Sequence, residues 1–197
     1  MRIIHALLLI FIVVTQGGCL HILMGSIAVT TAAALAMQDK SLGNTVDDTT
    51  LLIRINKELL KHGLFSSIRV KVSEGRILLI GNVSSPEKQL QAEKIAWQQK
   101  EVKEVINEIR VTPINMSSPV STTIDAIITT EIKTRLFAKK NIKSVNYTVN
   151  TIDNTVYLMG IAQNKKELSS VISIARKVKG VKEVISYVRY RNSRLRG

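Results

Sequence analysis

The spacing of apolar residues in the second half of this chain predicts five elements, in the order helix, strand, strand, helix, strand. Apolar residues recur every four positions, on one face of a helix, at Ile124, Ile128, Ile132 and Leu136. Alternating apolar positions predict a strand over residues 145–149, and a short apolar run predicts a second strand over residues 156–159, closed by Gly160. A second amphipathic pattern over residues 168–178 comes before a last strand over residues 184–190.

The first half of the chain repeats this pattern. The segment Val102–Ile106 recurs identically as Val181–Ile185, and the same spacing relates Ile80 and Gly81 to Met159 and Gly160. Upstream the spacing is two residues shorter, and there Asp48 matches Asp125. The change falls in a predicted hairpin turn, where insertions are tolerated, so it supports the alignment of the two copies.

These patterns predict an α+β fold of two tandem domains, each α-β-β-α-β. A helix between the second and third strands makes those strands parallel, whereas the first two form an antiparallel hairpin. Each domain is then a three-stranded mixed sheet packed against two helices. We place the domains at residues 47–111 and 122–190, with a linker at 112–121 and a basic tail at 191–197. We expect each copy to fold by itself, and Gly81 and Gly160 to end strands where a side chain would clash.

The N-terminus carries an export signal. Arg2 precedes a strongly apolar run over residues 3–14, and two glycines precede Cys19, the single cysteine of the chain. We expect residues 1–18 to be a lipoprotein signal peptide and Cys19 to carry the acyl chains. Gln16 departs from the usual apolar residue, so an uncleaved signal anchor is the alternative. Leu20 stands where Asp would retain a lipoprotein in the inner membrane, which indicates the outer membrane.

Residues 19–46 are expected to form the lipidated N-terminus and a tether. The part from 20 to 37 has the length of a spanning helix but is only mildly apolar. We interpret it as a tether on or near the membrane, with a second spanning segment as the alternative.

The net positive charge of the chain indicates an anionic partner. The chain has 28 basic and 15 acidic residues, a formal charge of +13, and residues 122–197 carry most of the excess. Nucleic acid and anionic lipid both suit this charge, but an export signal argues against nucleic acid. The chain has no histidine pair within its domains, no phosphate-cradling glycine loop and no clustered metal ligands. We therefore expect no enzyme activity, no cofactor, no metal and no small-molecule substrate.

The repeated motifs resemble the BON domain family. Residues 79–81 and 158–160 match the end of its second strand, and Gly180 to Val184 match its later Gly-Val-x-x-Val motif. The first copy departs at Glu101, where Gly is usual. The two-domain, lipidated members of the family are the most similar type. That resemblance implies a periplasm-facing, lipid-anchored outer-membrane protein that binds anionic phospholipid through the first helix of the second domain. It also implies a role in envelope integrity and enrichment at cell division sites.

The residues of the first helix of the second copy are consistent with a lipid-binding site. At 100° per residue, a second stripe points away from the predicted core, with lysines beside it. The candidate phospholipid-binding residues are Ile127, Thr130, Lys133, Thr134, Phe137 and Lys140. Exposed apolar residues beside lysines suit an anionic bilayer. Two alternatives stay open: the stripe packs on the other domain or the linker, or it docks an envelope protein. The first copy lacks a comparable basic pairing.

Overall fold

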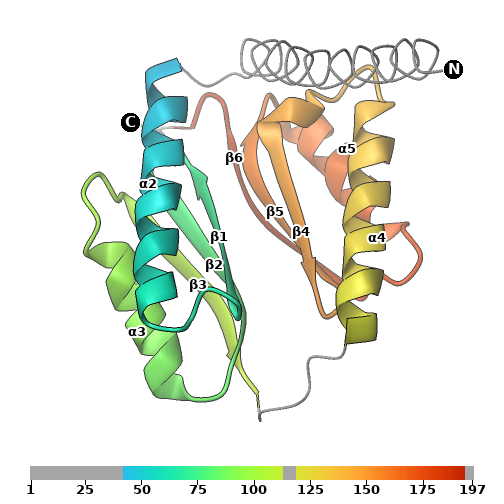
Figure 1. The fold of residues 1–197 in the computed structure, drawn as a ribbon. Coiled ribbons are helices and arrows are strands. Elements are labelled where there is room, and N and C mark those ends of the chain that lie inside the picture. The colour runs from blue at the N-terminus through green and yellow to red at the C-terminus, as the bar shows by residue number, and fades with distance from the viewer. Residues whose placement is uncertain (1–41, 113–118, 194–197) are drawn as a thin grey trace, which may run out of the picture. The chain divides into compact units, whose positions relative to one another are not determined.

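The computed structural model describes residues 42–112 and 119–193, with side chains from Asp47 and from Thr122 onward. The first copy consists of α2 (Leu42–Lys61), β1 (Ile68–Ser73), β2 (Arg76–Val83), α3 (Pro86–Trp97) and β3 (Glu104–Val111). The second consists of α4 (Pro119–Phe137), a 3₁₀ turn (Ser144–Asn146), β4 (Tyr147–Ile152), β5 (Thr155–Ala162), α5 (Lys165–Arg176) and β6 (Glu183–Tyr190). The predicted order is confirmed in both copies (Figure 1). The expected signal peptide, Cys19 and the tether up to residue 41 lie outside the described residues.

The strand pairing also follows the prediction. In the first sheet β1 pairs antiparallel with β2, and β2 pairs parallel with β3. The second sheet repeats this with β4, β5 and β6. Two helices cover one face of each sheet (Figure 1). Two helix boundaries differ from the expected domain limits, because α2 begins at Leu42 within the expected tether and α4 begins at Pro119 within the expected linker. Proline is well tolerated in the first turn of a helix, which explains the second boundary.

Each copy has its own apolar core between its helices and its sheet. In the second copy Ile128, Ile132 and Leu136 are buried against β4 and β5, as the four-residue period predicts. The period fails at Ile124, whose side chain is 41 % exposed, whereas the adjacent Asp125 is buried. The polar residue therefore occupies the position on this face of the helix that the apolar pattern assigned to Ile124.

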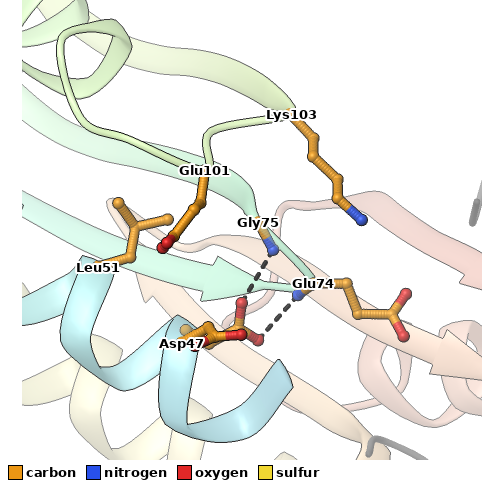
Figure 2. A pocket seen from close by; sticks show the side chains of 7 residues that line it. Asp47, Leu51, Glu74, Gly75, Glu101 and Lys103 are labelled. Atoms are coloured by element: carbon orange, nitrogen blue, oxygen red, sulfur yellow. Dashed lines mark hydrogen bonds between the residues drawn. The ribbon is translucent and has the colours of Figure 1, made fainter. Parts of the chain in front are cut away.

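A buried aspartate fixes the hairpin turn in each copy. The Asp48 carboxylate accepts the backbone N–H groups of Glu74 and Gly75, at 2.8 and 2.9 Å, and these two bonds are drawn in Figure 2. Asp125 does the same for the turn between β4 and β5, again at 2.8 and 2.9 Å. All four turn residues have positive φ, a conformation that needs such support when the residue is not glycine. The repeated aspartate thus holds the helix to the hairpin.

The expectation that Gly81 and Gly160 end their strands is wrong. Both lie inside β2 and β5, which continue to Val83 and Ala162. The expected clash is confirmed: a Cβ on Gly81 would lie 2.1 Å from the carbonyl oxygen of Ser67, and one on Gly160 would lie 1.9 Å from that of Asn146. These glycines therefore let the start of the neighbouring strand approach, and the strand runs on past them.

A third apolar cluster joins the two sheets on their helix-free faces. Leu78 and Ile80 of β2 are buried with Tyr157 and Met159 of β5. These residues are equivalent in the repeat, since each pair is separated by the 79-residue spacing. Around the cluster, Arg189 of the second copy forms a 2.8 Å ion pair with Glu104 of the first. The predicted fold lacks this cluster, because it places an apolar core on only one face of each sheet.

All three clusters are formed by residues between Leu51 and Val188. The chain from Gln38 onward also forms one compact unit. A fragment of residues 38–197 therefore contains every buried apolar group of the described fold, and we expect it to fold without the preceding residues. The expectation that each copy folds by itself stays a prediction, and separating the copies would expose the third cluster to water.

The contact between the copies predicts a weakness at high pH. The Tyr187 hydroxyl donates to the Glu108 carboxylate, and burial together with this carboxylate raises the pKa of Tyr187. Because the folded pKa lies above the unfolded value of about 10, the stability is intact below that pH and is lost as the pH rises further. We expect Tyr187→Phe to lose less stability than the wild type between pH 9 and 11. Urea unfolding of residues 38–197 measures this, and equal losses in both proteins would contradict it. Burial also raises the pKa of Tyr157 and Tyr147, so the variant retains part of the slope.

Candidate functional site

The outward face of α4 carries the residues that the sequence analysis selected. Ile127 is 60 % exposed and Phe137 is 81 % exposed. The polar members are exposed as well: Thr130, Lys133, Thr134 and Lys140. The helix phase is therefore correct, and neither apolar residue is packed on the first domain.

Local contacts keep this face of α4 regular and cationic. The Thr134 hydroxyl donates to the carbonyl oxygen of Thr130 one turn earlier, at 3.0 Å. Glu131, the acidic residue of this stretch, pairs with Arg135 four positions later. Its charge is thereby balanced within the helix, and Lys133 keeps an excess positive charge beside the apolar residues. We define the lipid face as Ile127, Thr130, Lys133, Thr134, Phe137 and Lys140.

The structure brings two residues of the first domain to this face that sequence reasoning missed. Arg69 of β1 donates to the carbonyl oxygen of Thr151 in β4, at 3.3 Å. The hydroxyl of the same Thr151 accepts a 2.8 Å hydrogen bond from Thr129 of α4. Lys71 follows Arg69 by two residues, and Lys133 follows Thr129 by four. Burial lowers the pKa of Lys71, and the charges of Lys133 and Arg69 lower it further. The two hydrogen bonds to Thr151 thus bring β1, which carries Arg69 and Lys71, to the side of the second domain where α4 carries Thr129 and Lys133.

The first helix of the first domain has an exposed apolar stripe of its own. Ile53 is 62 % exposed and Leu60 is 65 % exposed, and Leu60 is the repeat equivalent of Phe137. The nearby Lys61 is engaged in a 2.7 Å ion pair with Glu58. The first helices of both copies therefore expose apolar residues. They differ in that Lys61 is paired with Glu58, whereas Lys133 forms no ion pair among the described residues.

Other features of the described residues give weaker indications of a functional site. A pocket beside the first hairpin, with a volume of about 190 Å³, is lined by acidic side chains and Lys103 (Figure 2). Its central carboxylate, Asp48, is bonded to the turn. Within residues 42–112 and 119–193, no three histidine, cysteine or acidic side chains come together as metal ligands. In the same part of the chain, no helix is both long and apolar enough to span a bilayer.

Comparison with known proteins identifies the domains. The family model described as BON domain matches residues 47–113 and again residues 124–192. This chain belongs to the BON domain family. Its two BON domains are the two copies of the repeat, so the family expectation and the predicted fold are both confirmed.

Curated relatives cover most of the chain. A protein of Anaplasma centrale named "Uncharacterized protein in gshII 5'region" is 58 % identical, over 77 % of this chain and 99 % of the relative. "Outer membrane lipoprotein DolP" of Haemophilus influenzae is 29 % identical, over 88 % of this chain and 89 % of the relative. "21 kDa hemolysin" of Actinobacillus pleuropneumoniae is 31 % identical, over 77 % of this chain and 78 % of the relative. The chain is similar to each of these proteins over at least 77 % of its length.

Proposed function

We propose that this protein is an outer-membrane lipoprotein, anchored through Cys19 and facing the periplasm, that binds anionic phospholipid through α4 of its second BON domain. The observation that carries the proposal is the lipid face, where Ile127 and Phe137 are exposed beside Lys133 and Lys140. The apolar side chains enter the boundary between headgroups and acyl chains, and the ammonium groups meet phosphates. The printed name of the Haemophilus influenzae relative supports the location.

The cellular part of the proposal is a role in envelope integrity, with enrichment at division sites. A dividing envelope exposes strongly curved membrane, and binding through a shallow amphipathic face depends on curvature and on lipid composition. A fluorescent fusion should therefore gather at the septum, and a fusion carrying Phe137→Glu should spread evenly along the outer membrane. Cells lacking the protein should become more permeable to large hydrophobic antibiotics.

Vesicle flotation tests lipid binding directly. Residues 38–197, which lack Cys19, should float with vesicles containing phosphatidylglycerol, increasingly as its content rises, and less at high salt. A protein adaptor that uses the same helix face would ignore lipid composition. Flotation that is absent at every phosphatidylglycerol content would refute the lipid proposal and leave the adaptor as the function of this face.

The anchor makes a separate prediction. Cys19→Ala should leave an unacylated protein with an uncut signal that no longer fractionates with the outer membrane. Each buried methylene of an acyl chain contributes about 0.8 kcal/mol to membrane binding, so the loss should be large. Mass spectrometry of the membrane fraction measures the acyl groups, and an unchanged mass and fractionation would rule out lipidation.

A further inference from the structure

Three cations gather where β1 of the first BON domain meets α4 of the second. Arg69 and Lys71 lie on the same face of β1, since residues two apart in a strand point to the same side. Thr129 and Lys133 lie on the same side of α4, one helical turn apart. Both pairs meet at Thr151 of β4, which accepts from Arg69 through its carbonyl oxygen and from Thr129 through its hydroxyl.

This arrangement leaves positive charge without a partner. Among the described residues, neither Lys71 nor Lys133 forms an ion pair. Lys71 is half-buried, and its lowered pKa shows that its charged form is destabilised by burial and by the other two cations. A group of like charges that disfavours its own charged state is relieved when an anion binds between its members.

The carboxylates of this region are already engaged. Asp125 and Asp153 line a pocket of about 220 Å³ together with Arg69. Both oxygens of Asp125 accept backbone N–H groups of the hairpin turn, and Asp153 accepts from the side-chain amide of Asn82 at 2.8 Å. The acids serve the turn and the contact between the domains, so an external anion is the available partner for the two lysines.

The repeat contains a natural comparison. The strand registers place the two-residue change in spacing between the first helix and the first strand, because Ile68 pairs with Gly81 as Tyr147 pairs with Gly160. The equivalents of Arg69, Lys71 and Lys133 in the other copy are therefore Thr148, Asn150 and Asn56. All three equivalents are neutral. The cation cluster is therefore not a consequence of the BON fold, and it belongs to one pairing only, that of β1 with α4.

We propose that Lys71 and Lys133, with Arg69 holding β1 against β4, form a phosphate-binding site built by both BON domains. The ligand is the phosphate of an anionic phospholipid headgroup, so the inference rests on the proposed lipid function and extends it. Lys133 also belongs to the lipid face, which places a headgroup beside the side chains that enter the membrane. The first domain then takes part in lipid binding through β1, and not through its own first helix.

Lys71→Met tests the site, since methionine keeps the apolar stem and removes the charge. In residues 38–197 the variant should bind phosphatidylglycerol vesicles about fivefold more weakly, the usual effect of one lysine near an anionic surface. Lys94→Met is the matched control, because Lys94 is an exposed lysine of the same domain on α3. The control should change affinity less than twofold. Equal losses in the two variants would show a general effect of charge and would overturn the site.

Stability separates binding from a structural role. Because Lys71 is destabilised in the folded protein, Lys71→Met should leave the thermal midpoint of unfolding unchanged or raise it, while affinity falls. If the midpoint falls together with affinity, Lys71 acts by maintaining the fold, and the proposal is wrong.

Inorganic phosphate separates this site from the proposed lipid function. In the wild type, phosphate should shift the amide resonances of residues 69–71 and 129–133, and in Lys71→Met it should not. If the wild type fails to float with vesicles but shows these shifts, the lipid function is wrong and the site binds soluble phosphate. If the wild type floats, Lys71→Met floats equally well and phosphate shifts nothing, the lipid function stands and the site is refuted.

Discussion

Phe137→Glu should abolish binding to phosphatidylglycerol vesicles while leaving the second BON domain folded. Phe137 is 81 % exposed, so its side chain contributes little to the core. Loss of an inserted phenyl ring removes about 2–3 kcal/mol of burial, and a carboxylate facing an anionic surface costs about 1 kcal/mol more. Together these correspond to a loss of affinity of about 100- to 1,000-fold. Flotation of residues 38–197 measures the loss, and circular dichroism verifies the fold.

Leu60→Glu is the control that the repeat provides. Leu60 occupies the same position in α2, is 65 % exposed, and has a lysine nearby that is paired with Glu58. We expect it to change flotation less than twofold. A loss as large as that of Phe137→Glu would mean that both first helices contact the membrane. Normal flotation of Phe137→Glu itself would place the lipid site elsewhere, with the arginines of the C-terminal tail as the next candidates.

The helix face of each domain could be predicted because a single period governs it. Ile128, Ile132 and Leu136 are buried as the four-residue spacing requires, and Phe137 is exposed for the same reason. Ile124 breaks the rule because Asp125 takes the buried position to bond the hairpin turn, and that turn is distant in sequence. Hydrogen bonds between distant segments leave no mark on hydrophobic periodicity.

The second apolar face of each sheet was visible in the sequence but was not used. The run Ile77–Ile80 is apolar at every position, which is typical of a strand covered on both faces. Its alternate residues indeed divide between the helix core and the cluster shared by the two sheets. The cluster could therefore have been predicted from this run together with its equivalent in the other copy.

Lys71 could not have been assigned to the lipid face from sequence. Its position beside Lys133 depends on how β1 lies against β4 and α4, and Arg69 fixes that contact through a backbone carbonyl. A bond to a carbonyl oxygen places no requirement on the identity of residue 151, so the sequence carries no trace of the pairing. Residues that enter a site from another domain are found only once the domains are packed.

Gly160→Ala should unfold the second BON domain or destabilise it by about 3–5 kcal/mol. The added Cβ would lie 1.9 Å from the carbonyl oxygen of Asn146, a backbone atom that cannot move without displacing the start of β4. The φ of 134° adds strain that glycine alone avoids. Gly81→Ala should do the same to the first domain, where the corresponding distance is 2.1 Å. Urea unfolding of residues 38–197 measures both losses.

Gly63→Ala separates the two causes of that loss. Gly63 also has a positive φ, of 67°, but a Cβ there would meet no atom within 4 Å. Its replacement should therefore cost only the backbone strain, about 1 kcal/mol. If Gly81→Ala, in the same domain, costs no more than Gly63→Ala, the close approach of the neighbouring strand is not what requires glycine inside β2 and β5. If it costs several times more, the two glycines inside β2 and β5 are required by the backbone of the neighbouring strand, whatever these domains bind.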